Sequence, residues 1–129
     1  MENIETKQIL IVRKDLNMRK GKLVAQCAHA SLKSILNLGK ISNNVLSIPL
    51  TSTLLEWLDG RYTKICVYVN SEAELTELYA KAKALRMPTV LITDLGLTEF
   101  KGVPTVTCCA IGPAKSETID KLTSHLPLL

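Results

Sequence analysis

The sequence has no long hydrophobic run and no recognisable cysteine motif. The apolar run Ile9 to Val12 is far too short to cross a bilayer, and the first seven residues are polar and of mixed charge, unlike a signal peptide. The four cysteines show no CxxC spacing and no histidine at zinc-ligand distance, and a disulfide framework would need a shorter, denser, secreted chain. We therefore expect no membrane segment, no metal site, and reduced cysteines in a cytoplasmic protein.

Size and charge set further limits. The chain has 129 residues and a hydrophobic fraction of 47%, as expected for one packed domain spanning residues 1–129. Residues 1–40 hold eight lysines and arginines against three acids, a net charge of +5, whereas residues 41–129 carry −1. Such a concentration of positive charge suits a polyanionic partner. Taken alone, however, the charge is better explained by solubility.

The hydrophobic pattern alternates between strand and helix periods. Strands are predicted at residues 8–13, 62–69, 89–93 and 105–111. Helices are predicted at residues 20–37, 51–58, 116–124, and between the Ser71–Glu74 capping box and the stop at Met87-Pro88. About eleven residues join the last two strands, too few for a helical crossover, so one strand should be antiparallel. The expected fold is α/β: a single domain with a four-stranded mixed β-sheet and helices on both faces, binding ligands where strands end and helices begin.

The first predicted helix carries a narrow polar stripe. Its members are Lys22, Gln26, His29 and Lys33, which fall within about 60° of one another at 100° per residue. The rest of the circumference is apolar, which predicts a mostly buried helix. The stripe is then either the wall of a cleft or an ordinary solvent-facing side. The cations Arg19 and Lys20, beside the free N–H groups of the helix start, favour an anion site.

Two residues of this helix bear on the type of catalysis. His29 is a candidate general base, although a lone histidine on a helix is more often a hydrogen-bonded structural group. Cys27 points away from the Lys22 side by the same helical geometry. No serine or cysteine with an adjacent base is evident, so a covalent mechanism is disfavoured.

Five sequence blocks follow one another in a recognisable order. They are M-x-x-G-K-x-x-A-Q-x-x-H-A at 18–30, S-E-A-E-L at 71–75, P-T-V-L-I-T-D-x-G-x-T at 88–98, T-V-T leading to A-I-G-P-A at 105–114, and the closing segment 119–129. In this order they resemble the type II peptidyl-tRNA hydrolases, the archaeal and eukaryotic type. The match spans most of the chain and lapses mainly at residues 37–59.

The resemblance implies a metal-free esterase, without a cofactor, that recycles tRNA from prematurely released peptidyl-tRNA. It also implies a homodimer, the state of many members. The lysine, aspartate and threonine implicated in catalysis in the family correspond to Lys22, Asp94 and Thr98. Gln26 and the basic residues near Lys20 match positions linked to substrate contact.

Plainer interpretations and two departures stand beside these assignments. Asp94 could simply cap the next turn, with Gly96 supplying a positive φ, and Thr98 could be an ordinary loop hydroxyl. Many family members have serine where Ala28 stands and arginine where Leu97 stands. The loss of a hydroxyl and a cation leaves fewer groups to hold the tRNA end, which predicts altered substrate handling or an inactive relative.

The combined prediction is hydrolysis by a water molecule. Asp94, oriented with Thr98, or alternatively His29, removes a proton from the water, and Lys22 with nearby helix N–H groups stabilises the oxyanion. The residues predicted to contact substrate are Arg19, Lys20, Gln26 and Lys33. Two rivals remain: a non-catalytic RNA-binding or adaptor module on the same fold, and a hydrolase acting on another small ester or amide.

Overall fold

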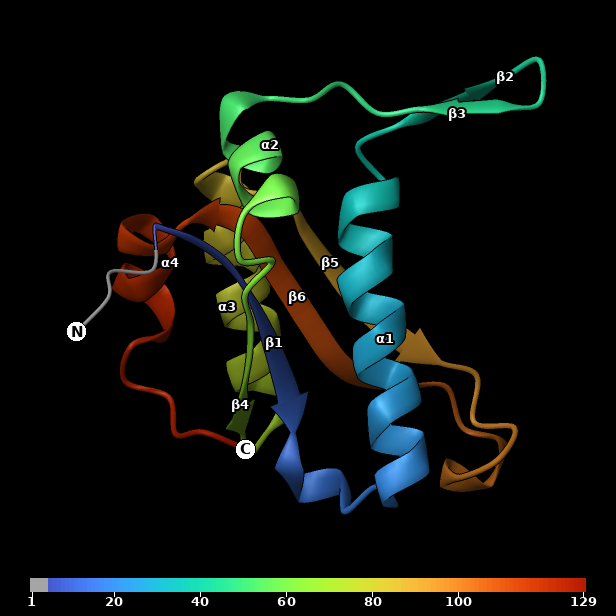
Figure 1. The fold of residues 1–129 in the computed structure, drawn as a ribbon. Helices are drawn as coiled ribbons and strands as arrows, with labels where there is room; N and C mark the ends of the chain where they lie inside the picture. Colours follow the sequence, from blue (N-terminus) through green and yellow to red (C-terminus); the bar gives the residue numbers. More distant parts are fainter. Residues whose placement is uncertain (1–4) are drawn as a thin grey trace.

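The computed structural model describes residues 5–129, and a four-stranded mixed sheet forms its centre (Figure 1). The strands are β1 (Thr6–Arg13), β4 (Lys64–Val69), β5 (Thr89–Asp94) and β6 (Thr105–Lys115), in the spatial order β4-β1-β6-β5. β4 runs parallel to β1, whereas β6 is antiparallel to both of its neighbours. The expected fold class is confirmed, and β6 is the antiparallel strand that the short connection required. Residues 1–4 of the predicted domain, with most of the polar N-terminal segment, lie outside the described residues.

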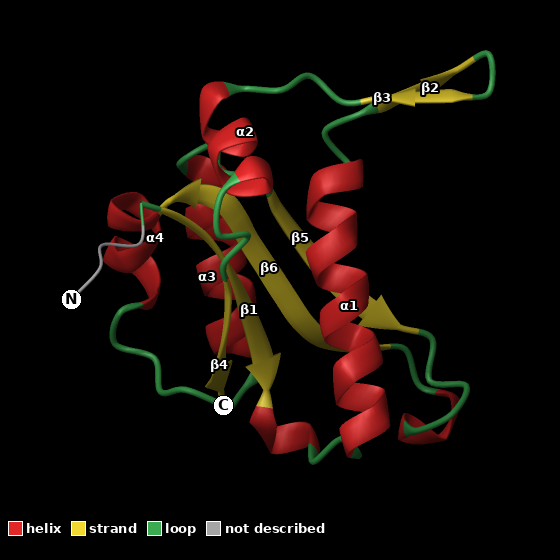
Figure 2. Cartoon of the chain, viewed as in Figure 1, coloured by secondary structure: helices red, strands yellow, loops and turns green. Residues whose placement is uncertain are grey.

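Helices cover both faces of the sheet (Figure 2). They are α1 (Lys20–Leu36), α2 (Ser52–Asp59), α3 (Glu72–Ala84) and α4 (Ser116–Thr123). On one face, Leu75 of α3 and Ile119 of α4 pack with Ile11 and other strand residues in a fully buried cluster. On the other face, Ala30 of α1 packs with Leu10, Cys108 and their neighbours. None of the helices within residues 5–129 is long and apolar enough to span a membrane.

The predicted capping box at the start of α3 is present. Ser71 Oγ accepts a hydrogen bond from the backbone N–H of Glu74 at 3.2 Å, and Glu74 Oε2 accepts one from the N–H of Asn70 at 2.8 Å. The first bond satisfies one of the N–H groups of the helix that have no partner inside it, and the second ties Asn70, the residue before the N-cap Ser71, to the first turn.

Two features of the backbone differ from the prediction. No element was predicted within residues 38–50, but they contain a hairpin of β2 (Lys40–Ser42) and β3 (Val45–Ser47) that projects from the body as an arm (Figure 1). Its turn residues Asn43 and Asn44 have φ of 50° and 63°, as a tight hairpin turn requires. Strands of three residues are too short to show an alternating pattern, which is why the hairpin was missed.

The second difference lies at Gly112-Pro113, which was expected to end the last strand. β6 instead continues to Lys115. Gly112 has φ of 101°, and a Cβ there would lie 2.6 Å from Lys7 O, so only glycine allows β1 to approach so closely. Successive residues of a strand turn their backbone groups to opposite neighbours, and the N–H of Gly112 bonds to Pro88 O, just before β5 begins. The backbone of Pro113 therefore faces away from β5, and the missing N–H of this proline removes no hydrogen bond to that strand.

Polar side chains fix α1 at one position on the sheet. Ser31 Oγ donates to Gln8 Oε1 at 2.6 Å, and Gln8 Nε2 donates back to Ser31 O at 3.0 Å. Ser34 Oγ donates to Gly112 O at 2.7 Å. Because a buried polar group without a partner is costly, a slide of the helix along the sheet would break these pairs and is opposed.

The prediction of a mostly buried α1 is wrong. Only Gln26, Ala30 and Ser34 are fully buried, whereas Val24 is 67% and Leu32 is 57% exposed. A helix that lies on one sheet buries a single side, and nothing within residues 5–129 covers the opposite side. Gln26, expected on an open stripe, belongs to the buried side instead.

Candidate active site

The predicted site residues gather at one end of the sheet. β1 and β5 run in the same direction, and their carboxyl ends meet the first turn of α1 there (Figure 1). The loop 95–104, which contains a short 3-10 turn at Phe100–Gly102, closes this corner. Such an edge, where strands end and a helix begins, is the usual ligand position in α/β sheets.

Lys22 lies at the centre of the cluster. Its Nζ donates to Asp94 Oδ1 at 2.7 Å and to Thr98 Oγ1 at 2.9 Å. The Lys22 and Asp94 side chains are each 13% exposed, so the ion pair is largely shielded from water. An ammonium has three N–H donors, and the contacts with described residues use two. The third is available to a bound molecule.

Asp94 is held from several directions. Its Oδ1 also faces Gln26 Nε2 at 3.4 Å, and its Oδ2 accepts the backbone N–H of Gly96 at 2.9 Å. The hydrogen bond from Lys22 is the main cause of a lowered pKa at Asp94, and the Gly96 N–H, the Lys22 charge and Gln26 act in the same direction against desolvation. The carboxylate is therefore ionised at neutral pH. Gly96 has φ of 82°, so the plainer interpretation, a cap on the next turn, also holds.

Gln26 is oriented by a residue that the sequence did not single out. Thr107 Oγ1, on β6, donates to Gln26 Oε1 at 2.6 Å, which turns the amide nitrogen toward Asp94. Both Gln26 and Thr107 are buried. Thr107 lies within a matched sequence block, but a threonine in an apolar strand reads as a packing residue. Its role became visible only when the strand was placed opposite α1.

The start of α1 is open to anions. Arg19 precedes the helix and makes no side-chain capping bond within the described residues, so the first N–H groups of the helix remain accessible. The Arg19 side chain is 89% exposed, with Nε 3.7 Å from Glu99 Oε1, and Lys20 is also exposed. Both predicted substrate contacts therefore lie beside Lys22 and face water.

Two predicted site residues lie outside this cluster. His29 and Lys33 are exposed on α1, one and two turns beyond Gln26, and no hydrogen bond joins either of them to Lys22, Asp94 or Thr98 within residues 5–129. Both line a separate hollow of about 530 Å³ between α1 and β5. The structure thus favours Asp94 over His29 as the group nearest the reacting centre.

The two departures from the family pattern lie on the same side of the molecule. Ala28 lines the hollow next to His29. Leu97 is 84% exposed and directly precedes Thr98. Neither substitution interrupts the contacts among Lys22, Asp94 and Thr98.

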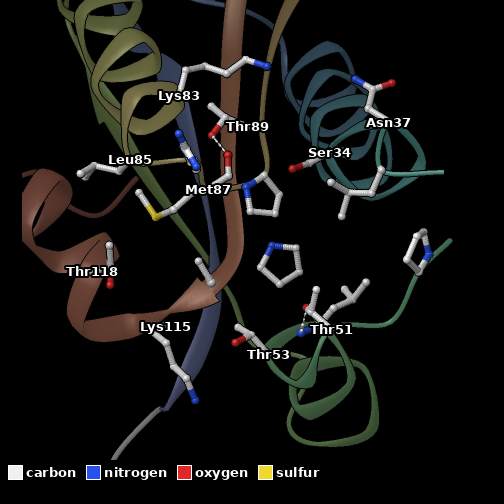
Figure 3. Close-up of a pocket in the computed structure, with 17 residues that line it drawn as sticks. Ser34, Asn37, Thr51, Thr53, Lys83, Leu85, Met87, Thr89, Lys115 and Thr118 are labelled. Carbon is white, nitrogen blue, oxygen red and sulfur yellow. Dashed lines mark hydrogen bonds between the residues drawn. The ribbon is translucent and has the colours of Figure 1, made fainter.

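A larger hollow of about 760 Å³ lies at the other end of α1 and contains none of the predicted site residues (Figure 3). It is bounded by the ends of α1, α3 and β6 and the start of α2. Hydroxyl groups on its wall are already used: Ser34 donates to Gly112 O, and Thr89 Oγ1 donates to Met87 O at 2.8 Å. The larger hollow therefore does not coincide with the predicted site residues, which gather at the Lys22 cluster instead.

Other chemistries find little support. Residues 5–129 contain no group of three or more His, Cys, Asp or Glu that could hold a metal ion. All four cysteines are free. Cys27 packs against the sheet beside Cys108 rather than on the Lys22 side, and burial raises the pKa of Cys108 to about 11. None of these thiols lies in the cluster as a nucleophile.

Comparison with known proteins identifies the family of the chain. The family model described as "Peptidyl-tRNA hydrolase PTH2" matches residues 6–129. The chain belongs to this family. It is 42% identical to the peptidyl-tRNA hydrolase of Sulfurisphaera tokodaii over 96% of this chain and 98% of that protein. For the peptidyl-tRNA hydrolase of Methanocaldococcus jannaschii, the identity is 40% over 95% and 99%.

A eukaryotic relative agrees as well. The probable peptidyl-tRNA hydrolase 2 of Dictyostelium discoideum is 39% identical over 96% of this chain and 55% of that protein. The resemblance inferred from the five sequence blocks is therefore confirmed. Within the PTH2 family, the cluster of Lys22, Asp94 and Thr98 is the part of the chain whose geometry suits catalysis.

Proposed function

We propose that this protein hydrolyses the ester bond between a peptidyl or N-acyl-aminoacyl group and tRNA. Membership of the PTH2 family and the names of its archaeal relatives support this activity. The observation that carries the proposal is the contact of Lys22 with both Asp94 and Thr98, 2.7 Å and 2.9 Å away. Residues 1–129 would act as one domain, in the cytoplasm, where free cysteines are stable.

The proposed mechanism uses the hydrogen-bond donors and acceptors of Lys22 and Asp94 that have no partner among the described residues. The third N–H of Lys22 donates to the ester carbonyl as negative charge develops on its oxygen, an interaction worth roughly 3 kcal/mol in the transition state. Its position is fixed in advance because Asp94 and Thr98 hold the other two N–H groups. No reorganisation is then needed during the reaction.

Asp94 has one position left for water. An ionised carboxylate offers about four acceptor sites, and described residues occupy three of them, two on Oδ1 and one on Oδ2. A water held at the remaining site on Oδ2 passes a proton to the carboxylate as its oxygen forms a bond to the carbonyl carbon. The bond between that carbon and the ribose oxygen of tRNA then breaks, and the ribose oxygen takes the proton from Asp94 and leaves as a hydroxyl. The lowered pKa makes Asp94 a weak base, so its main contribution is orientation of the water.

Binding of tRNA falls to the open start of α1. Arg19, Lys20 and the first helix N–H groups would contact phosphates of the single-stranded acceptor end, whereas Lys33 lies in the separate hollow between α1 and β5 and would not. Ion pairs with phosphates release counterions, so the affinity for tRNA should fall steeply with salt. Gln26 is buried and bonded to Asp94 and Thr107, so its contact with substrate would be indirect.

The test is release of the N-acetyl amino acid from N-acetyl-aminoacyl-tRNA by wild type and Lys22→Met. Wild type should turn over, and Lys22→Met should lose about 10²–10³-fold in kcat/KM. Lys115→Met is the control, because it breaks an exposed 2.9 Å pair with Glu56 at the opposite end of the molecule and should keep full activity.

Two outcomes of that assay would select the rivals. An inactive wild type that binds tRNA with a steep salt dependence would make the protein an adaptor, as the changes at Ala28 and Leu97 would permit. Equal activity on an N-acetyl-amino acid ester without the tRNA body would make it a general small-ester hydrolase.

A second copy of the chain is the proposed protein partner, and the hairpin arm supports it. Ile41, Val45 and Leu46 on the arm are 80%, 56% and 44% exposed, and an isolated two-stranded hairpin is marginally stable in water. Light scattering after size exclusion should give a dimer for wild type and a monomer for Ile41→Glu. Leu55→Glu, at a 48% exposed position on α2, should stay dimeric. A monomeric wild type would end this part of the proposal.

A further inference from the structure

β5 has an open edge beside the Lys22 cluster. It is the last strand in the order β4-β1-β6-β5, so β6 is its one neighbour among the strands of residues 5–129. The N–H of Gly112 bonds to Pro88 O at 2.7 Å, so Pro88 and Gly112 form a hydrogen-bonded pair between β5 and β6. Because bonded pairs alternate along an antiparallel ladder, Val90 and Ile92 turn their backbone groups toward β6, and Leu91 turns its N–H and C=O outward.

A hollow of about 530 Å³ runs along this edge, between β5 and α1. It is lined by Ala28, His29, Leu32, Lys33, Leu36 and residues 90–93. The lining is mostly apolar, and Leu32, on the α1 wall, is 57% exposed. The volume lies within the range of ordinary ligand sites. One end of the hollow, at Thr93, directly precedes Asp94, so the hollow opens onto the proposed reaction centre.

We infer that this hollow holds the peptidyl part of the substrate as an added strand on the edge of β5. The inference rests on the proposed function, because the ester carbonyl must lie at Lys22 and Asp94. The peptide then extends from its C-terminal ester, at the Asp94 end, back toward Val90. Its direction is that of β5 itself, so the added strand pairs in parallel, with Leu91 donating to one peptide carbonyl and accepting from one peptide N–H.

The geometry sets the peptide length at which this contact begins. Leu91 precedes Asp94 by three residues, a distance of about 10 Å along an extended strand. A single N-acylated amino acid does not reach it, whereas a chain of three or four residues does. Bonds to the main chain are independent of the peptide sequence, and the apolar walls accept most side chains, which suits a substrate whose sequence varies.

The lining of the hollow favours peptide over nucleic acid. Lys33 and His29 are its only residues that can carry positive charge, and the remaining side chains are aliphatic or threonine. A phosphate backbone would instead be drawn to Arg19, Lys20 and the open helix start at the other side of Lys22. The two parts of the substrate thus leave the reaction centre in different directions.

The kinetic test uses one tRNA that carries N-acetylated oligopeptides of one to five alanine or leucine residues. For wild type, kcat/KM should rise about tenfold between one and four residues, mainly through KM, and then level off. Leu32→Glu, which places a carboxylate in the apolar wall, should flatten this rise, whereas Leu55→Glu should keep it. A flat wild-type profile, or a rise that survives Leu32→Glu, would overturn the inference.

The same assay separates this inference from the proposed function. If wild type hydrolyses the one-residue substrate and shows no dependence on length, the hollow has no role and the hydrolase stands. If wild type hydrolyses none of the substrates, the proposed function itself fails.

N-methylation of the peptide gives a sharper test of strand pairing. In a strand, alternate N–H groups point to the same side, so single N-methyl groups placed along a four-residue peptide should raise KM at alternate positions. Equal effects at every position, or none, would exclude an added strand. In ¹⁵N NMR spectra, an acetylated tetrapeptide amide should shift the Leu91 amide saturably, and the trinucleotide CCA should shift the start of α1 instead. A CCA-induced shift at Leu91 would contradict the assignment.

Discussion

The two ends of α1 use polar side chains in opposite ways. At the far end, Ser31 and Ser34 donate their single hydroxyl hydrogens to Gln8 and to the carbonyl of Gly112, so neither keeps a donor for a ligand. At the near end, Lys22 keeps one free N–H and Asp94 one free acceptor site after all contacts with described residues are counted. The far end borders the hollow of about 760 Å³, yet the near end holds the groups that can still act.

If the proposed function is correct, the reaction centre is identified by donors and acceptors left without a partner and not by the size of a hollow. Donors and acceptors that are paired within the protein stabilise the fold. Donors and acceptors that are held rigidly but have no partner can bind a ligand and stabilise a transition state. The comparison predicts that substitutions at Lys22 and Asp94 change activity far more than stability, that a substitution at their buried support Thr107 changes both, and that substitutions at the far end change stability alone.

The largest effect is expected from Asp94→Asn. The amide cannot accept a proton from water and no longer balances the charge of Lys22, so kcat/KM on N-acetyl-aminoacyl-tRNA should fall by about 10²–10⁴. Circular dichroism should show an intact fold. Activity within threefold of wild type would remove Asp94 from the mechanism.

A smaller effect is expected from Thr107→Val. The buried Gln26 amide loses the hydroxyl that orients it, and its oxygen is left without a partner. We expect about a tenfold loss in kcat/KM and a loss of about 1–3 kcal/mol in the free energy of unfolding, measured by urea titration. Thr107→Ser restores the hydroxyl and should recover most of the activity. If the serine variant is as impaired as the valine variant, packing rather than orientation is the cause.

At the far end, Ser34→Ala should affect stability alone. The variant loses the 2.7 Å bond to Gly112 O, a change of about 1 kcal/mol in the free energy of unfolding. Its kcat/KM should equal that of wild type. A tenfold loss of activity would show that the two ends are coupled and would break the comparison.

The smallest effect is the pH dependence between pH 5 and 8. Lys22 lowers the pKa of Asp94 in the folded protein. The ion pair therefore stabilises the fold fully above the pKa of an unfolded aspartate, near 4. This stabilisation is lost as the pH falls through the lower pKa of the folded state. The difference in Tm between wild type and Asp94→Asn should therefore be constant from pH 5 to 8 and change only below about pH 4. A change centred near pH 6 would mean that Asp94 is not held by Lys22.

The sequence predicted the strands and helices because these depend on local patterns, which also place Lys22 near a helix start and Asp94 at a strand end. That these two residues would meet was an expectation from the family resemblance, with which the edge of an α/β sheet is consistent. The capping box at Ser71 was equally local. These features need no knowledge of how the helix rests on the sheet.

The features that the sequence did not predict depend on how α1 packs on the sheet. Gln26 and Thr107 are adjacent only because α1 is fixed on the sheet by pairs such as Ser34 and Gly112, which no periodicity encodes. Helical spacing grouped His29 with Lys22, but their separation of seven positions corresponds to about 10 Å along the helix axis, enough to place His29 in another hollow. The exposed apolar side of α1 was missed because burial depends on what covers a surface, and the hairpin arm was missed because its strands are too short to show a pattern.

The most direct measurement is a double-mutant cycle on Lys22 and Asp94. kcat/KM on N-acetyl-aminoacyl-tRNA would be measured for wild type, Lys22→Met, Asp94→Asn and the double variant. If the ammonium and the carboxylate act as one unit, the double variant should be no worse than the poorer single variant. Losses that multiply in the double variant would show that the two groups act independently, and the shared centre described above would be wrong.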